Sequence, residues 1–320
     1  MGQFLLRRIL ISIPVLLGIT VAMFIIINLA PGDPVTALLN PEQAAALGPG
    51  WVEQQRERMG LNDPMPVRYV YWLRETVTGN LGFSYTDHQA VSHKIGDRLW
   101  PTLKLMGLVL IVAVAVGVPL GVISALRQYS ILDYALTVLG FLTVSIPSFF
   151  LALVVIYVFA LKLDWLPATG MYTVGQTRSF TDSLQHIILP AAVLGLAQAA
   201  PIIRYTRASL LETVRQDYVT TARAKGLSES SVVVGHSLRN ALIPIITVVA
   251  LNVPSLLGGT VIIEQVFAWP GMGSLAIGAV QNRDYNTLMG INLIAAIMIL
   301  LSNLLADMVY ALVDPRIRYQ

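Results

Sequence analysis

Long apolar runs separated by short polar segments set the pattern of this chain. A bilayer core about 30 Å thick is crossed by roughly 20 apolar residues in a helix. The runs of that length predict an all-α polytopic membrane protein with six transmembrane helices, over residues 9–30, 102–126, 134–162, 187–209, 241–265 and 288–313. Because the first run exceeds the roughly 7–15 apolar residues of a signal peptide, we expect it to remain as a span.

Residues 31–101 mix polar and amphipathic stretches and predict a small helical cap on the extracytoplasmic side. The apolar spacing predicts one helix over Trp51–Met59, stopped by Gly60, and a second over Val67–Val77. An amphipathic stretch over 91–99 then leads into the second span. The expected divisions are 1–30 for the first helix, 31–101 for the cap, 102–313 for a five-helix core with a loop at 210–240, and 314–320 for a tail.

The stretch TTARAKGLSESS (220–231) is the most polar part of the second half of the chain. Apolar residues at helical spacing over 210–218 predict that the fourth span continues as a helix to Gly226, a residue suited to a left-handed cap. Ser228 is expected to cap a second helix. That helix carries three valines at 232–234, which predict either a contact with another protein or packing on neighbouring helix ends.

Composition supports the membrane assignment. Of the 320 residues, 55% are hydrophobic and 12% charged, whereas soluble domains carry about 25% charged residues. Cysteine is absent, which excludes disulfides and thiolate metal sites. The net charge of +3 is small, and we attribute it to membrane orientation rather than to nucleic-acid binding.

Basic residues are distributed unequally between the two sides of the predicted membrane. One set of segments contains Arg7, Arg8, Arg127, Arg204, Arg207, Arg215, Arg223, Lys225, Arg239, Arg316 and Arg318. The short loops on the other side contain only Lys162, Arg178 and Arg283. Since short cytoplasmic loops are enriched in lysine and arginine, both termini and the 220–231 loop are expected in the cytoplasm.

Small and polar residues inside the spans are candidates for a translocation pathway. The main group lies in the fifth span and a weaker one in the third: Asn252, Pro254, Ser255, Gly258, Gly259 and Glu264, then Ser145 and Ser148. Close helix packing explains the small residues equally well. Glu264 has the alternative of lying in interfacial water.

Motifs for catalysis are missing from the sequence. There is no G-x-x-x-x-G-K-[ST] phosphate loop and no G-x-S-x-G elbow, so no catalytic residue is expected. The four histidines lack metal-site spacing and are expected on the surface: His88, His93, His186 and His236. No ionisable residue lies at the centre of a span, which disfavours the main alternative, an ion-coupled secondary transporter. A membrane scaffold, a third alternative, does not account for prolines in nearly every span.

Five motifs in order resemble the permease subunits of binding-protein-dependent ATP-driven importers, in the branch that handles peptides and nickel. They are LAPGDP (29–34), GNLGFSY (79–85), DYVTTARAKGLSESSVVVGHSLRNALIP (217–244), GGTVIIEQVFAWPGMG (258–273) and DPRIRY (314–319). The sequence departs from the family at Thr220 and Thr221, near a glutamate of the general motif, and at Gly235, where a basic residue is frequent. The resemblance covers nearly the whole chain.

The resemblance implies a type I importer permease that forms half of a peptide pathway by alternating access in a bacterial or archaeal cytoplasmic membrane. It implies a second related permease, two cytoplasmic ATPases that bind ATP and magnesium, and an extracytoplasmic solute-binding protein. We expect segments 31–101 and 269–284 to receive that protein, because the cap is too structured for a linker and a second glycine-broken outer segment accompanies it. The coupling residues that dock on an ATPase would be Ala222, Arg223, Lys225, Gly226, Leu227, Ser228 and Glu229. Dipeptides, longer peptides, glutathione and nickel chelates all remain open as solutes.

Overall fold

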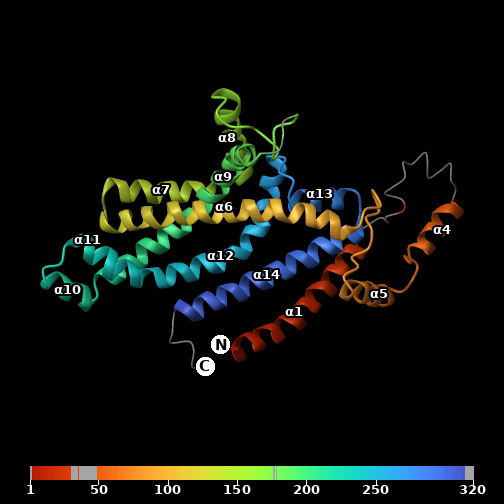
Figure 1. Cartoon of the computed structure of the whole chain (residues 1–320), viewed down its shortest axis with the longest axis horizontal. Helices are drawn as coiled ribbons and strands as arrows, with labels where there is room; N and C mark the ends of the chain where they lie inside the picture. The colour runs from red at the N-terminus through yellow and green to blue at the C-terminus, as the bar shows by residue number, and fades with distance from the viewer. Residues whose placement is uncertain (1, 30–34, 36–48, 176, 178, 314–320) are drawn as a thin grey trace. The chain divides into compact units, whose positions relative to one another are not determined.

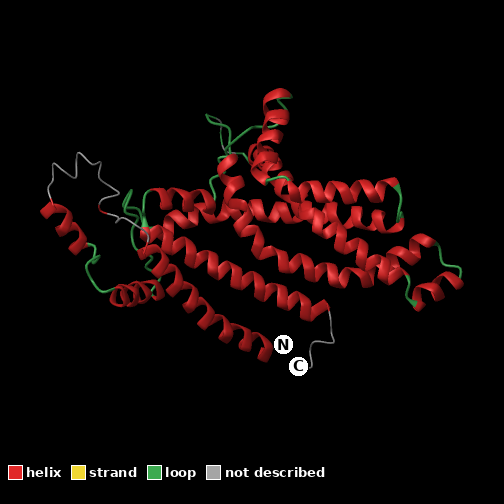
Figure 2. Ribbon diagram, turned by 180° about the vertical axis from the view of Figure 1, so that it is seen from behind, coloured by secondary structure: helices red, strands yellow, loops and turns green. Residues whose placement is uncertain are grey.

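The computed structural model describes residues 2–29, 35, 49–175, 177 and 179–313. Its regular secondary structure is helical, and one isolated antiparallel bridge joins Phe83 and Ala90. Figure 1 follows the helices along the chain, and Figure 2 shows helices and loops, with no strand drawn in the described residues. The predicted all-α class is therefore confirmed.

The helices agree closely with the apolar pattern. Their bounds are α1 Gly2–Leu29, α4 Pro49–Arg58, α5 Met65–Val77, α6 Val91–Leu126, α7 Ile131–Ser145, α8 Ser148–Val155, η1 Ile156–Lys162, α9 Phe180–Val214, α10 Asp217–Ala224, α11 Glu229–Ser231, η2 Val232–Leu238, α12 Arg239–Val266, α13 Met272–Gln281 and α14 Tyr285–Val313. The segments η1 and η2 are π-helical. The two helices expected within 31–101 are present as α4 and α5, and Gly60 between them has a φ of +64°.

Four described helices are long and apolar enough to cross a membrane: α1 from Leu6, α6, α9, and α14 as far as Val309. A fifth crossing results if α7 and the continuous α8–η1 count as one span, which bends by 105° at its break. In α12 the apolar stretch Arg239–Pro254 is shorter. By length and composition the described helices thus account for four or five crossings, against six predicted.

Contacts divide the chain into two compact units, and the first comprises Met1–Thr102 and Pro270–Leu300. Two apolar clusters form its core. In one, Phe24 and Ile27 of α1 and Met289 of α14 are buried against Tyr69 and Trp72 of α5. The other contains Val91, Ile95, Met272, Ala279 and Ile291.

Polar contacts in the first unit join two outer segments that are distant in sequence. Ser84, from the GNLGFSY motif, donates its hydroxyl to the carboxylate of Asp284, and the Tyr85 amide donates to the same carboxylate at 3.2 Å. Asn286 donates its side-chain amide to the Phe83 carbonyl at 2.9 Å. The motif and the segment after α13 therefore form one surface.

The second unit comprises Leu103–Trp269 and Leu301–Gln320. Its helices α6 and α9 approach closely at two glycines four residues apart. A Cβ atom on Gly117 would lie 2.7 Å from the Ile202 side chain, and one on Gly121 would lie 2.5 Å from that of Thr206. Such glycine pairs allow membrane helices to pack backbone against backbone.

The predicted helix continuous from the fourth span to Gly226 is wrong. Helix α9 ends at Val214 and α10 begins at Asp217. The amides of Arg215 and Gln216 bond three residues back, to the carbonyls of Glu212 and Thr213 at 3.4 and 3.1 Å. These bonds tighten the last turn and end the helix, although the apolar spacing continues through the break.

The short helix α13 has Ser274, a residue type suited to capping, in its first turn, yet Ser274 does not cap the helix. The helix begins at Met272, with Gly271 in the cap position, and Ser274 lies in the first turn with its hydroxyl donating to the Gly271 carbonyl at 2.8 Å. The Met272 amide instead donates to the hydroxyl of Thr102 at 2.8 Å. A distant side chain has replaced the local cap.

Candidate functional site

The loop between α9 and α12 is a helix–turn–helix whose turn is fixed by backbone hydrogen bonds. The Gly226 amide donates to the Arg223 carbonyl at 2.9 Å, and the Leu227 amide donates to the Ala222 carbonyl at 3.4 Å. Gly226 has a φ of +78°. This pair of bonds around a left-handed glycine is the Schellman motif, which ends α10 sharply. The predicted cap at Gly226 is confirmed.

The second arm of the loop begins at the predicted serine. The Ser228 hydroxyl accepts a hydrogen bond from the Ser231 amide at 3.4 Å, with Glu229 in the first turn. The helix continues through η2 into α12 without a break. Ser228 is therefore confirmed as the N-cap of this arm.

A small apolar core holds the two arms together. Val219 and Ala222 of α10 pack against Val232, and all three are buried. Val233 is also buried, whereas Val234 is 64% exposed. Of the two interpretations of the valines, packing within the chain explains the first two, and only Val234 is left on the surface.

An ion pair crosses the turn. The Arg223 guanidinium donates to both carboxylate oxygens of Glu229, at 3.2 and 2.6 Å. The hydrogen bonds from Arg223 lower the pKa of Glu229 from its ordinary value of 4.5. Both members of the pair are therefore charged at neutral pH. Because the pKa of Glu229 is lower in the folded chain than in the unfolded chain, the ion pair stabilises the fold above the unfolded pKa, and this stabilisation is lost as the pH falls through the folded pKa.

The tip of the loop is accessible. Lys225, Gly226, Leu227 and Ser228 are exposed, and an added Cβ on Gly226 would meet no atom within 4 Å. The seven predicted coupling residues thus lie together on one turn, with only Ala222 buried. The result is a pre-shaped surface with an apolar leucine at its tip.

The predicted pathway residues of the fifth span all lie in α12. Asn252 donates to the Val248 carbonyl at 2.7 Å and lines a small pocket with Gln198 of α9 and Leu110 of α6. Pro254 is half-buried in the same helix. Ser255, Gly258 and Gly259 are helical, and their side-chain surroundings lie outside what the structure describes. Gln198, which the sequence analysis did not select, faces the pathway candidate Asn252.

Glu264 is completely buried, so the alternative that it lies in interfacial water is wrong. The helix ends around it: the Trp269 amide donates to the Glu264 carbonyl at 2.7 Å, and Phe267 and Trp269 are also buried. Both rings belong to the apolar core that also contains Ile263 of α12. A carboxyl group near a span end is therefore enclosed in protein.

Ser145 and Ser148 flank the break between α7 and α8. Ser145 is exposed and donates to the Phe141 carbonyl at 2.9 Å, and Ser148 is the first residue of α8, after Pro147. Neither serine is near Asn252 in any contact that the structure describes. Helix α8, which Ser148 begins, packs against α12, the helix that carries the main group of pathway candidates.

One buried ion pair was missed in the sequence. Arg207 of α9 makes two hydrogen bonds to Asp133 of α7, both 2.8 Å long. Asp133 also accepts from the Ser124 hydroxyl and from the Tyr129 amide. The sequence shows Asp133 in the first turn of α7 and Arg207 after the long apolar run of α9. No local pattern in the sequence indicates that these two residues pair.

The histidines are not all on the surface as predicted. His88 and His93 are exposed, but His186 is buried in α9, with Nδ1 2.9 Å from the Asp182 carbonyl oxygen. In the described part of the chain, no group of three or more histidine, aspartate or glutamate side chains is placed to hold a metal ion.

Comparison with known proteins identifies this assembly of helices. Residues 117–319 match the family described as binding-protein-dependent transport system inner membrane component. Residues 1–106 match the family of binding-protein-dependent transport system membrane components, N-terminal. The chain belongs to the permeases of binding-protein-dependent importers. As a permease of this family it is a multi-pass membrane subunit, and the importer assignment made from the five motifs is confirmed.

Curated relatives of this permease align over its full length. The oligopeptide transport system permease protein AppB of Bacillus subtilis is 43% identical over 320 residues, 100% of both chains. The dipeptide transport system permease protein DppB of Alkalihalophilus pseudofirmus is 38% identical over 337 residues, again 100% of both chains. The glutathione transport system permease protein GsiC of Escherichia coli is 36% identical over 320 residues, with the same coverage.

The fold of the permease is similar to a solved importer. A chain of the MetNI methionine ABC transporter superposes with a TM-score of 0.56 at 17% identity, covering 69% of this chain and 96% of the other. At this identity the likeness concerns the fold alone. The ion-coupled alternative has no support among these relatives.

Proposed function

We propose that this permease forms half of a pathway for peptides, paired with a second related permease. Full-length relatives named for oligopeptides, dipeptides and glutathione support a peptide solute. A solute-binding protein would deliver the peptide to the surface formed by 79–85 and the segment around α13. The joining of Ser84 to Asp284 supports the use of both segments in one surface.

The proposed topology has six spans in the cytoplasmic membrane of a bacterium or archaeon, with both termini in the cytoplasm. The basic residues of the short loops support this orientation. The sixth span is α12, whose 28 residues have a length of about 42 Å at 1.5 Å per residue. The bent pair α7 and α8–η1 is counted as one span.

ATP and magnesium are proposed to bind to two partner ATPases, and the exposed turn at Gly226 carries this part of the proposal. The turn is pre-shaped by its hydrogen bonds, presents Leu227 at its tip, and is continuous with α12 through η2. Movement of the turn by an ATPase would therefore be transmitted to the helix that holds Asn252. Alternating access follows if α12 moves against α6 and α9.

Replacing Gly226 with valine tests this coupling. A Cβ in the left-handed region costs about 1 kcal/mol for alanine and more for a branched side chain. The open space around Gly226 leaves assembly unaffected, but the second arm of the loop changes direction. We expect normal amounts of complex and loss of the ATP hydrolysis that loaded binding protein stimulates.

Gly235 provides a matched control in the same loop. It is helical, and an added Cβ would meet nothing within 4 Å. Gly235→Ala should retain stimulated hydrolysis and uptake. Full stimulation and full uptake in Gly226→Val would show that the turn does not couple. Uptake of dipeptides, longer peptides, glutathione and nickel chelates by the same reconstituted complex would decide the solute.

A further inference from the structure

Helix α5 lies along the side of α1 rather than beyond its end. The Tyr69 hydroxyl is 3.0 Å from the Thr20 hydroxyl, and the Tyr69 ring packs edge-on against Phe24 at 5.4 Å between centroids. Thr20 precedes the end of α1 at Leu29 by nine residues, or about 13 Å along the helix. Figure 1 shows α5 beside the last turns of α1. Since α1 is a membrane span, the Tyr69 side chain contacts that span nine residues inside its end, so α5 packs on the outer half of α1 and not beyond it.

The two faces of α5 have different surroundings. Met65, Tyr69 and Trp72 face α1 and the cluster around Phe24. The opposite face is exposed and mostly apolar, with Arg74 as its one charged residue: Val70 is 62%, Tyr71 59% and Val77 80% accessible in this chain. These residues recur at helical spacing and form one stripe, with Val67 at its start. A short helix that packs on a membrane span and exposes a mostly apolar stripe has the form of an interfacial helix.

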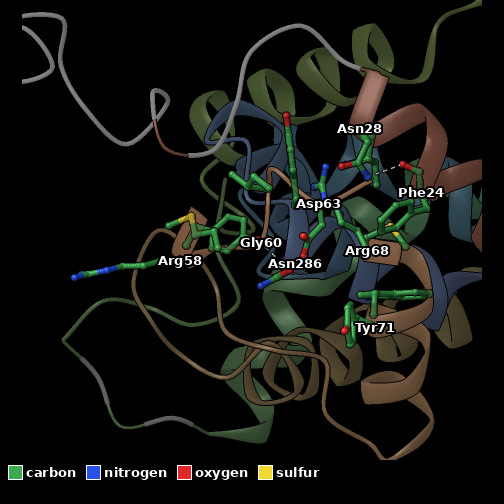
Figure 3. A pocket seen from close by; sticks show the side chains of 15 residues that line it. Phe24, Asn28, Arg58, Gly60, Asp63, Arg68, Tyr71 and Asn286 are labelled. Atoms are coloured by element: carbon green, nitrogen blue, oxygen red, sulfur yellow. Dashed lines mark hydrogen bonds between the residues drawn. The ribbon is translucent and has the colours of Figure 1, made fainter. Parts of the chain in front are cut away.

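A cavity of about 350 Å³ opens beside the flank of α5. Its floor is apolar, from Phe24 and Ile27 of α1 and Met289 of α14. Trp72 and Tyr71 form an aromatic wall, and Arg68 and Asn286 provide polar groups. Figure 3 shows these side chains converging from α1, α5 and α14, whereas Arg58 points away from them.

Arg58, Arg68 and the acidic Asp63 all line this cavity, and because Arg58 points away, Arg68 is the cation nearest to the aromatic wall. Among the residues that the structure describes, no carboxylate lies within ion-pair distance of its guanidinium, and the ion pairs of this unit are formed by other residues. A guanidinium presents a planar set of N–H donors that suits a phosphate group. Tryptophan and tyrosine beside it are the residues enriched at the level of lipid headgroups.

We propose that α5 is an interfacial helix with its Val67–Val77 stripe in the lipid of the membrane, and that the cavity under Arg68 holds the phosphate of a phospholipid headgroup. The depth of α5 favours lipid over a soluble partner, which would have to reach below the outer end of α1. The apolar floor suits the glycerol and first acyl carbons of the lipid. Only the choice of the outer leaflet rests on the proposed orientation.

Single cysteines test the position of the stripe, since the natural chain has none. Nitroxide labels at Val70 and Val77 would be measured in the complete importer, reconstituted in vesicles of phosphatidylethanolamine and phosphatidylglycerol. We expect collisions with oxygen to exceed those with a water-soluble nickel chelate at both positions. A label at Glu53 on α4 is the control and should show the reverse. The comparison does not require transport or a particular orientation.

Three outcomes at the stripe are distinguishable. Preference for oxygen supports the proposal. Preference for the nickel chelate would overturn it and would leave the stripe open to a soluble partner such as the binding protein. Low accessibility to both reagents would also overturn it, because the stripe would then be covered by another subunit.

The cavity is tested through Arg68→Gln, with Arg98→Gln as control. Arg98 is an arginine of the same unit that lines a different pocket. In native mass spectra of the purified importer, we expect several-fold fewer phospholipid adducts in Arg68→Gln and an unchanged number in Arg98→Gln. Inorganic phosphate should not displace the adducts if the acyl portion contributes. Equal adduct numbers in both variants, or displacement by phosphate alone, would overturn the lipid site.

Discussion

The pair formed by Asp133 and Arg207 is a buried, two-pronged contact between α7 and α9. Its carboxylate also accepts hydrogen bonds from Ser124 and Tyr129, so each oxygen has at least two partners. The Asp133 carboxylate is buried and the Arg207 side chain is 29% exposed, so loss of Asp133 leaves a guanidinium that water solvates only in part.

Replacing Asp133 with alanine should therefore destabilise the subunit by about 1–3 kcal/mol, less than the loss expected for a fully buried pair. The melting temperature of the purified complex would measure the effect. Arg204→Ala, at an exposed position one turn earlier in α9, is the control and should change little. Adding Arg207→Met to Asp133→Ala should recover part of the loss. A melting temperature equal to that of Arg204→Ala would show that the pair contributes nothing.

Single residues also show what local sequence can and cannot predict. Gly226 and Ser228 were identified correctly because capping depends on neighbours within five residues. Asp133 and Arg207 are 74 residues apart, so their pairing depends on how α7 and α9 pack. The burial of Glu264 was missed because a carboxylate near the end of a predicted span gives no local sign of what packs around it.

Among the helices, α6 and α9 meet at the most constrained contact. The added Cβ at Gly121 would lie 2.8 Å from the Ile203 carbonyl as well as 2.5 Å from Thr206. Backbone does not give way as a flexible side chain does, so the helices themselves must separate.

Gly121→Ala should accordingly lower stability by about 1–3 kcal/mol through overpacking. Gly107 lies on the same helix, and its added Cβ would meet nothing within 4 Å. Gly107→Ala should be neutral or slightly stabilising, since alanine is the better helix former. Thermal unfolding of the two variants in parallel gives the comparison. Similar melting temperatures would mean that α6 and α9 can move apart without cost.

Helix positions were predicted more reliably than helix ends. The apolar period located α4 and α5 to within two residues at each end. It continued past Val214, where the chain turns, and it gave no sign of the π-helical segments η1 and η2. A period reports which faces are apolar, whereas ends and π-turns depend on hydrogen bonds to specific neighbours.

For the whole molecule, the proposed orientation can be tested with the natural absence of cysteine. Ser228 and Asn282 are both exposed and lie on opposite predicted sides of the membrane. A cysteine at Asn282 should react with a membrane-impermeant thiol reagent in intact cells with a permeable outer envelope. A cysteine at Ser228 should react only after the cells are opened. Both should react in detergent.

Labelling of Ser228 from outside would contradict both the orientation and the docking of a cytoplasmic ATPase. The sequence predicted the class, the membrane environment and the family of the whole chain, because hydropathy and motifs are properties of single segments. The residues that line the pathway could not be predicted as well from the sequence. Asn252 and Gln198 line the same pocket only because α12 packs on α9, and the proposed second permease would add residues of its own.

The bend between α7 and α8 also bears on how the chain enters the membrane during synthesis. The first arm has 15 residues, and the second has 8 in α8 and 7 in η1. Each arm extends about 22 Å, short of the roughly 30 Å of a bilayer core. Neither arm can leave the translocon alone as a stable crossing. Both arms must therefore be synthesised before this part of the subunit moves from the translocon into lipid. Helix α6 is made earlier, so α7 can pack against α6 until α8 and η1 follow.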